Sequence, residues 1–357
     1  MLRARNHYFY FCVIIFMKVS PEEFLRLSQT TPVVDVRSPE EFSRGNIPGS
    51  VNLPLFDNVE RHEIGLLYKQ KSKEDAVERG LEVVAPKLAD FVRKAKSLSA
   101  DKHILVYCWR GGMRSQSFAW LMNTAGLKPL VLEGGYKKFR NYVLNFFSTP
   151  FNLLRLGGET GSGKTALLRK LAEKGEQVLD LEKLANHKGS AFGSIHESPQ
   201  LPQQQFEHLV FKKINTFNSS GVIWVEDEAM AIGWNKIPIQ LWKQMKAAPL
   251  IKLNIPFERR VCRLVADYST TDTALLRAPL IKIGKKLGGQ NLKAALEYLE
   301  LGRLKEVAEI ALTYYDEAYR HDIKKHETKN IVTLDCGELS EDNILTELIK
   351  KSQNQNV

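Results

Sequence analysis

The chain has 357 residues, more than the about 100 to 200 residues of a typical single domain, so two domains are expected. Its 43% hydrophobic and 26% charged residues are ordinary for a folded protein, which excludes a disordered or low-complexity chain. The formal net charge of +10 favours polyanionic partners such as nucleic acid, but a positive balance can also serve solubility alone.

The four cysteines, Cys12, Cys108, Cys262 and Cys336, contain no close pair. This spacing argues against a disulfide framework and against a cysteine-rich zinc site. We therefore expect a reducing, cytoplasmic location. We also expect no membrane partner.

The N-terminal segment 1–16 combines two arginines with an apolar run that is too short to span a bilayer. No small-residue cleavage site follows it, and Met17 opens a conventional-looking start. We expect this segment to be an extension outside the fold.

The first domain is expected over residues 17–147, where short β-rich runs alternate with helical patterns, as in parallel βαβ units. Strands are predicted at Val33–Val36, His103–Tyr107 and Pro129–Leu132. Apolar residues at helical spacing over Glu74–Leu98 predict one long helix, and further helices are expected after Arg114 and Gly135.

A loop with the sequence Cys-Trp-Arg-Gly-Gly-Met-Arg-Ser begins at Cys108, directly after a predicted strand and before a helix. Such a loop points successive backbone N–H groups at one centre, and Arg110 and Arg114 add positive charge. Both effects favour the thiolate, so Cys108 is predicted to be a nucleophile. The alternative is a buried structural cysteine, which the neighbouring arginines and glycines disfavour.

The second domain is expected over residues 150–357, after a short linker near Thr149–Pro150. A strand at 152–156 leads into a glycine-rich turn. Further strands are predicted at Gln177–Leu181, Val222–Val225, Leu250–Leu253 and Ile331–Leu334. From about Asp272 the pattern is almost entirely helical and predicts an appended helical region.

The turn Gly-Glu-Thr-Gly-Ser-Gly-Lys-Thr fits the phosphate-binding P-loop at every fixed position and lies between a strand and a helix. Its phosphate-binding residues are expected to be Gly158, Gly161, Ser162, Gly163, Lys164 and Thr165. Backbone N–H groups and the lysine would hold phosphate oxygens, and the Thr165 hydroxyl would ligate magnesium. No organic cofactor is expected.

Such a loop needs an acidic partner at the end of a nearby strand, and Glu226 and Asp227 follow an apolar run. A solvated acidic strand end is the alternative interpretation. Asp180, after another strand, is a weaker candidate of the same kind.

Residues 236–293 hold twelve basic side chains against three acidic ones, as a surface for nucleic-acid phosphates would require. The preferred contacts are Arg259, Arg260, Arg263, Lys282, Lys285 and Lys286. The alternative is that these residues only form the solvent-exposed faces of helices. Trp224, Trp234 and Trp242 are expected in the core rather than in base stacking.

The cysteine loop, together with the segments Val34–Phe42 and Gly45–Pro54, resembles a rhodanese domain. Five residues separate Cys108 from Arg114, one more than in the usual sulfur-carrying loop, which implies room for a tetrahedral oxyanion. The same spacing occurs in tyrosine-phosphatase-type loops, but Tyr107 stands where those enzymes usually have histidine.

A rhodanese-like domain followed by a P-loop is similar to the tRNA 2-selenouridine synthase family. The resemblance continues in three further segments, Leu184–Gly193, Ser198–Gln200 and Tyr314–Tyr319. One departure is at Ala229 and Met230, where the family usually has serine and a basic residue.

This resemblance implies a tRNA-modifying selenotransferase that converts wobble 2-thiouridine to 2-selenouridine. The S-geranyl intermediate, geranyl diphosphate and selenophosphate are all implied by the resemblance. Cys108, Arg110 and Arg114 would serve the selenium step, and the P-loop would hold the diphosphate of geranyl diphosphate. Two alternatives stay open: an ATP-dependent sulfurtransferase, and a P-loop kinase regulated by its rhodanese module.

Overall fold

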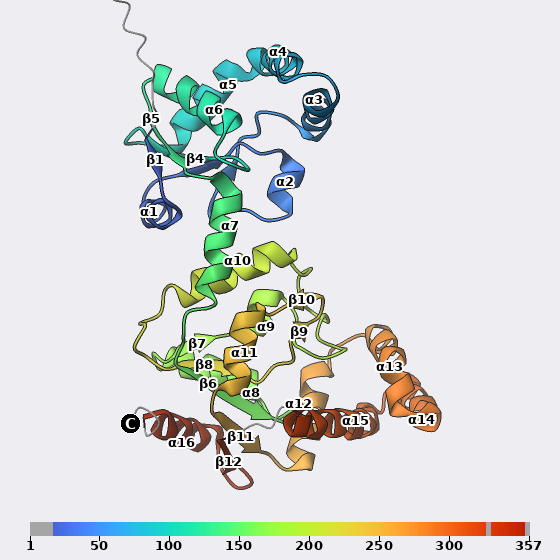
Figure 1. Cartoon of the computed structure of the whole chain (residues 1–357). Helices are drawn as coiled ribbons and strands as arrows, with labels where there is room; N and C mark the ends of the chain where they lie inside the picture. Colours follow the sequence, from blue (N-terminus) through green and yellow to red (C-terminus); the bar gives the residue numbers. More distant parts are fainter. Residues whose placement is uncertain (1–16, 326–329, 354–357) are drawn as a thin grey trace, which may run out of the picture. The chain divides into compact units, whose positions relative to one another are not determined.

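The computed structural model describes residues 17–325 and 330–353, so the predicted extension 1–16 lies outside the described residues. The chain divides into two compact units between Val143 and Leu144 (Figure 1). The linker was predicted six residues later, near Thr149–Pro150. In the second unit, Phe146 packs on Phe151 and Phe211. None of the helices in the described ranges is long and apolar enough to cross a bilayer.

The first unit is a parallel five-stranded sheet in the order β1-β5-β4-β2-β3 with helices around it. Its strands are β1 (Lys18–Val19), β2 (Val33–Asp35), β3 (Val51–Asn52), β4 (His103–Tyr107) and β5 (Lys128–Leu132). Its helices are α1 (Pro21–Leu27), α2 (Pro39–Ser43), α3 (Asn58–Gln70), α4 (Lys73–Val84), the 3-10 turn Ala85–Lys87, α5 (Leu88–Leu98), α6 (Met113–Thr124) and α7 (Gly135–Phe146). The predicted α/β class is confirmed for this unit.

Strand β4 places its side chains alternately on the two faces of the sheet. Ile104 and Val106 belong to the core cluster that contains the α5 and α6 side chains Phe91 and Phe118. Cys108, two residues further on, belongs to the same cluster. The strand therefore directs the cysteine toward the α5 and α6 side of the sheet.

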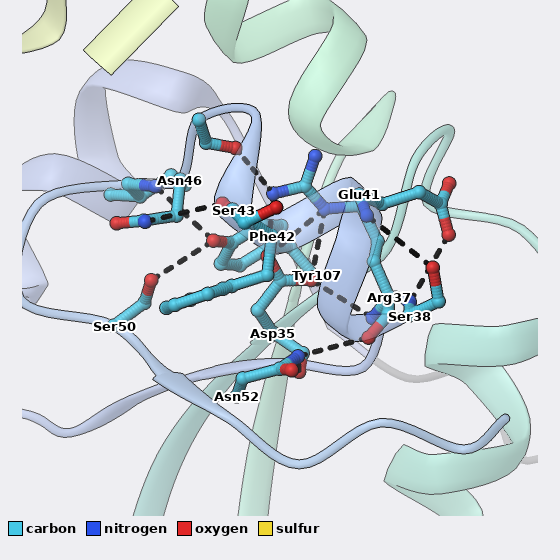
Figure 2. A network of polar contacts seen from close by, with 12 residues as sticks. Asp35, Arg37, Ser38, Glu41, Phe42, Ser43, Asn46, Ser50, Asn52 and Tyr107 are labelled. Atoms are coloured by element: carbon cyan, nitrogen blue, oxygen red, sulfur yellow. Dashed lines mark hydrogen bonds and ion pairs between the residues drawn. The ribbon is translucent and has the colours of Figure 1, made fainter. Parts of the chain in front are cut away.

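On the other face of the sheet, the Asp35-Val36-Arg37 segment forms a buried ion pair between Asp35 and Arg37. The Arg37 guanidinium donates to both carboxylate oxygens of Asp35 (Figure 2). It also donates to the Gly45 carbonyl and lies 3.8 Å from the centre of the Tyr136 ring. The hydroxyl of Tyr107 accepts from the Ile47 N–H at 3.2 Å. These contacts assign the segment, and the tyrosine at the phosphatase histidine position, to the scaffold.

The single helix predicted over Glu74–Leu98 is wrong, because the structure has α4 and α5 separated by a 3-10 turn. The turn contains Pro86, which lacks an N–H and disfavours helical backbone in the residue before it. Helix α3, which was not predicted, packs against α4. The break and the extra helix shape the space beside Cys108.

The second unit has another parallel five-stranded sheet, in the order β12-β11-β6-β8-β7. Its strands are β6 (Leu153–Gly158), β7 (Gln177–Leu179), β8 (Ile223–Glu226), β11 (Leu250–Asn254) and β12 (Ile331–Asp335), with a separate hairpin of β9 (Ala231–Ile232) and β10 (Asn235–Lys236). Its helices are α8 (Lys164–Glu173), α9 (Leu181–Ala185), α10 (Gln203–Ile214), α11 (Ile239–Ala247), α12 (Phe257–Tyr268), α13 (Thr273–Leu287), α14 (Gly289–Glu300), α15 (Leu304–Lys325) and α16 (Glu341–Gln353).

The P-loop follows the central strand of this sheet. Leu154 and Leu156 of β6 pack in one apolar cluster with Leu168 of α8 and Leu345 of α16. Because parallel strands end at the same edge, the ends of β6, β7 and β8 meet around the start of α8. That edge is where the acidic partners were predicted.

Candidate functional site

The cysteine loop runs from β4 to the first residue of α6. Its shape requires glycine at Gly111, with φ +64°, where an added β-carbon would lie 2.6 Å from the Leu132 carbonyl oxygen. Gly135, with φ +59°, packs on the loop, and a β-carbon there would lie 2.4 Å from the Cys108 carbonyl oxygen. The two glycines let α7 begin directly against the loop.

The Cys108 sulfur lies 3.2 Å from the Ser115 hydroxyl oxygen, and that hydroxyl donates to the Gly112 carbonyl. Gly112 is the N-cap of α6, and no side chain caps this helix end. Uncapped N–H groups at a helix start carry partial positive charge. Cys108 is buried, at 3% exposure, but it lines a cavity rather than being sealed in the core.

The two predicted arginines of the loop behave differently. Arg110 is exposed and lines the same cavity as Cys108. Arg114 also lines it, but its guanidinium donates to both carboxylate oxygens of Glu41, at 2.6 and 3.2 Å. Arg61, which sequence reasoning missed, lies 3.7 Å from the same carboxylate, and burial and the nearby Arg114 lower its pKa. Two arginines therefore share one carboxylate beside the cysteine.

The P-loop has the backbone that its glycines predict. Gly161 and Gly163 have φ of +80° and +82°, and Gly163 is the N-cap of α8. The Lys164 ammonium donates to the Gly158 carbonyl at 2.9 Å and lies 3.8 Å from Glu226. Ser162 is buried, and its hydroxyl has no hydrogen-bond partner within the described residues. A buried orphan hydroxyl in a phosphate loop suits a ligand oxygen.

The acidic partners are three glutamates. One carboxylate oxygen from each of Glu182, Glu226 and Glu228 lies within 4.8 Å of the others. The Thr165 hydroxyl donates to Glu182 at 3.0 Å and lies 3.5 Å from a Glu226 oxygen. Burial, followed by the charges of Glu182 and Glu228, raises the pKa of Glu226 well above its ordinary value. Burial and Glu182 raise the pKa of Glu228 to about 8.

The assignment of Asp227 as an acidic partner is wrong. Its carboxylate accepts from the buried Arg155 guanidinium at 2.8 Å and from the Lys246 ammonium at 3.3 Å. Asp227 thus neutralises the arginine that β6 places inside the unit. The weaker candidate Asp180 caps α9 by accepting from the Lys183 N–H, and it is Glu182, two residues later, that reaches the site.

This donor set fits a divalent cation. Three carboxylates and a hydroxyl offer only oxygen atoms, which magnesium prefers. Without a cation, three clustered carboxyl groups resist ionisation, as the raised pKa values of Glu226 and Glu228 indicate. Glu182, Glu226, Glu228 and Thr165 would hold the ion.

Helix α15 is part of the phosphate site and not an appendage. The Tyr319 hydroxyl accepts from the Gly158 N–H at 2.8 Å, and Tyr315 accepts from the Ala191 N–H at 3.1 Å. Asp316, on the same stretch of helix, receives both guanidinium nitrogens of Arg260 at 2.8 Å. The Tyr314–Tyr319 segment therefore ties the helical region to the P-loop and to the 184–193 segment.

The arginines predicted to bind tRNA are engaged within the unit. Arg260 is 5% exposed and also donates to the P-loop carbonyl of Thr160, so its assignment as a tRNA contact is wrong. Arg259 donates to the carbonyls of Cys336 and Gly337, which fixes the turn after β12. Arg263 lies over the P-loop, with a guanidinium nitrogen 1.6 Å from where a Gly163 β-carbon would be. The guanidinium of Arg263 also donates to the Glu341 carboxylate at 2.8 Å, beside the P-loop.

The remaining basic candidates are on the surface. Lys282, Lys285 and Lys286 are exposed on α13, and the Lys286 ammonium donates to the Tyr314 hydroxyl at 3.3 Å. Burial lowers the pKa of the buried His187, and the positive charge of Lys282 lowers it further. These lysines are the predicted tRNA contacts that the structure leaves accessible.

The three tryptophans have different environments. Trp224 is fully buried and donates to Glu176, which confirms its prediction as a core residue. Trp242 is half-buried. Trp234 is 66% exposed at the turn of the β9–β10 hairpin, so its placement in the core is wrong. Gln200 holds this hairpin by donating to the Ile232 carbonyl.

A cavity of about 1080 Å³ joins the phosphate site to an apolar wall. Its polar end has the P-loop, Glu182, Glu226, Glu228 and Arg263. The wall consists of α12, α13 and α15 side chains together with Phe192; these are Leu264, Val265, Tyr268, Leu276, Leu304, Val307, Ala308, Ala311, Leu312 and Tyr315. The cavity thus suits a ligand with a phosphate head and an apolar tail.

Sequence reasoning missed Glu182, Arg61, the position of Arg263 over the P-loop, and the apolar wall. Glu182 had a weak signal, because it comes shortly after a predicted strand whose end faces the P-loop. The others had none, since they depend on how α3, α12 and α15 pack.

Comparisons with known proteins agree with this architecture. A family model described as the tRNA 2-selenouridine synthase AAA domain matches residues 151–346, and a rhodanese-like domain model matches residues 20–142. The fold is therefore a rhodanese-like α/β domain followed by a P-loop-type α/β domain with a helical C-terminal part.

Several curated relatives carry the name tRNA 2-selenouridine synthase. The protein from Cupriavidus pinatubonensis is 38% identical over 261 residues, which is 71% of this chain and 70% of the relative. Those from Bordetella petrii and Bdellovibrio bacteriovorus are 34% and 35% identical, covering 87% and 86% of this chain and 91% and 93% of the relatives. With matches of this extent in both domains, the chain belongs to the tRNA 2-selenouridine synthase family.

Proposed function

We propose that this chain converts a wobble 2-thiouridine in tRNA to 2-selenouridine in two steps. The first step alkylates the sulfur with geranyl diphosphate, and the second replaces the S-geranyl group with selenium from selenophosphate. Family membership supports tRNA selenation, because the relatives are named for that activity. The division into two steps rests on the two sites described above.

The observation that carries the proposal is the joint lining of the P-loop cavity. One end presents Lys164, Arg263 and the glycine-rich backbone, and the other is apolar over α12, α13 and α15. A prenyl diphosphate has these two characters in one molecule, with an anionic head and a hydrocarbon tail. Burying the tail would add affinity that a bare phosphate ligand lacks.

In the alkylation step, the thiouridine sulfur forms a bond to the first carbon of the geranyl group. The carbon–oxygen bond to diphosphate breaks, and pyrophosphate leaves with the bonding electrons. Lys164 and Arg263 would stabilise the charge that develops on the leaving oxygen. Magnesium held by Glu182, Glu226, Glu228 and Thr165 would add Lewis-acid stabilisation of the same pyrophosphate.

In the second step, selenium bonds to C2 of the uridine and the C2–sulfur bond breaks. The geranyl thiolate leaves with the bonding pair and takes a proton, while water cleaves the phosphorus–selenium bond and phosphate departs. Cys108 serves this step, at the uncapped start of α6 beside Ser115. Arg110, Arg114 and Arg61 would bind the phosphate portion of selenophosphate.

The test is mass analysis of tRNA nucleosides from cells that lack the gene and carry either Cys108→Ala or Lys164→Ala. The lysine variant should lack the geranylated nucleoside, because the diphosphate is no longer held. The cysteine variant should accumulate that nucleoside, because only selenation is blocked. Wobble nucleosides that stay unchanged when the gene is deleted would contradict the proposal.

A further inference from the structure

The cavity beside Cys108 is large and mostly apolar. Its volume is about 1170 Å³, which is larger than that of usual small-molecule sites, roughly 300 to 1,000 Å³. It lies between the α3–α4 helix pair and α6, with Leu55 and Phe56 from the turn before α3. Its apolar lining includes Ile64, Leu66, Val77, Leu81, Val84, Leu88, Trp109, Met113, Trp120 and Leu121.

The exposure of helix α3 indicates that this cavity is open to solvent and is not a void inside the core. The helix has 13 residues and none of them is buried, although Ile64 and Leu66 face the cavity. Across the cavity, Leu81 and Trp120 are 67% and 51% exposed. Apolar side chains left open around a common space mark a binding site for apolar material.

The charged groups around this cavity have one sign. The basic side chains among its lining residues are Arg61, His62, Lys69, Lys73, Arg110 and Arg114; the other ionisable ones are the Cys108 thiol and the Tyr68 phenol. No carboxylate is among the lining residues, although Glu41, outside the lining, pairs with Arg61 and Arg114. The occupant should therefore combine an apolar portion with a polyanionic one.

We infer that this cavity holds the ten-carbon chain of the S-geranylated wobble uridine while selenium replaces sulfur at C2. The inference rests on the proposed function and names the place where its intermediate binds. The apolar lining would receive the chain, the exposed Lys69 and Lys73 would face tRNA phosphates, and Cys108 would lie next to C2. The chain would stay in the cavity as the geranyl thiol when the C2–sulfur bond breaks.

Each unit would then have its own apolar space for the same hydrocarbon chain. In the P-loop cavity the chain is attached to diphosphate, and beside Cys108 it is attached to the base. Geranylation would thus serve as a recognition handle as well as making sulfur a better leaving group. A tRNA that lacks the chain would bind the first unit weakly.

The test uses the full chain and two synthetic anticodon stem-loops, one with S-geranyl and one with S-methyl 2-thiouridine. The variant Leu66→Gln with Leu81→Gln makes two open positions of the lining polar without adding charge. Val59→Gln is the matched control, since Val59 is 77% exposed on α3 and is not among the lining residues. Binding of both stem-loops and selenium incorporation from selenophosphate are measured.

The unaltered protein should bind the S-geranyl stem-loop at least about tenfold more tightly than the S-methyl one, since burying roughly two methylene groups already has that effect. The double variant should lose most of this preference and keep its affinity for the S-methyl stem-loop, while Val59→Gln should change neither. Equal preference in the unaltered protein and the double variant would overturn the inference, even if selenium is incorporated. A failure of the unaltered protein to incorporate selenium into the S-geranyl stem-loop would instead contradict the proposed function.

Discussion

Replacing Arg260 by methionine should unfold the second unit more easily, and its effect on tRNA should be secondary. The side chains of Arg260 and Asp316 are 6% and 8% exposed and are joined by two contacts of 2.8 Å. Removing one partner of such a buried pair leaves an uncompensated charge and costs about 3 to 5 kcal/mol. Arg260 also donates to the Thr160 carbonyl, so the P-loop should loosen as well.

The double variant Arg260→Met with Asp316→Leu should recover much of that loss. Both charges are then gone, and apolar side chains of similar size can fill the space. Urea unfolding followed by tryptophan fluorescence, to which the buried Trp224 of this unit contributes, gives the free energies for the single and double variants. Lys285→Met, at an exposed lysine, should change stability by less than about 0.5 kcal/mol.

The reasoning would be refuted by Arg260→Met protein that unfolds at the same urea concentration as the unaltered protein but binds tRNA more weakly. That result would restore the sequence-based assignment of Arg260 to the tRNA surface. Asp316→Leu provides a second check, because it should be about as destabilising although it removes no positive charge.

Three further predictions concern the cation, the apolar wall and the cysteine loop. The pKa of Glu228 is raised from 4.5 to about 8, so ionising this carboxyl group costs stability as pH rises through that window. Without magnesium, the melting temperature should therefore fall over this range. Magnesium should raise the melting temperature more near about pH 8 than near about pH 6. Glu228→Gln should reduce that pH dependence, and an unchanged magnesium effect would speak against the cluster as the cation site. Ala308→Gln, which places a polar side chain in the apolar wall, should weaken geranyl diphosphate binding by about tenfold in calorimetry and leave pyrophosphate binding unchanged; equal losses for both ligands would mean that the tail binds elsewhere. Gly135→Ala should slow alkylation of Cys108 by iodoacetamide and lower the melting temperature, because its β-carbon would meet the loop backbone at 2.4 Å; wild-type alkylation kinetics would show that the loop shape does not depend on this glycine.

The parts of the fold that sequence predicts well are those with a local cause. The strands β4 and β11, the P-loop and the start of α6 follow from apolar runs and glycines that act over a few residues. The break at Pro86 also had a local signal, but the helical periodicity on both sides of it concealed the break. Helix α3 was missed because none of its residues is buried, which leaves little periodicity to detect.

Sequence reasoning predicted the site residues that belong to local motifs. It mispredicted those whose role depends on an ion pair with a residue distant in sequence. Lys164, Thr165 and Glu226 lie together as expected, because the ends of parallel strands meet at one edge. Asp227 and Arg260 were misassigned because their partners, Arg155 and Asp316, are 72 and 56 residues away in sequence. A charge run in a sequence does not reveal which of its members are neutralised within the fold.

The bond between Tyr319 and Gly158 spans 161 residues and has a consequence for biosynthesis. During synthesis the P-loop leaves the ribosome long before α15 and the edge strand β12 exist to complete its surroundings. Because distant contacts form slowly and late, a nascent or prematurely terminated chain should present a finished cysteine loop but an unfinished P-loop site. Under the proposed function, such a chain could not hold the prenyl diphosphate and would leave the tRNA sulfur unalkylated.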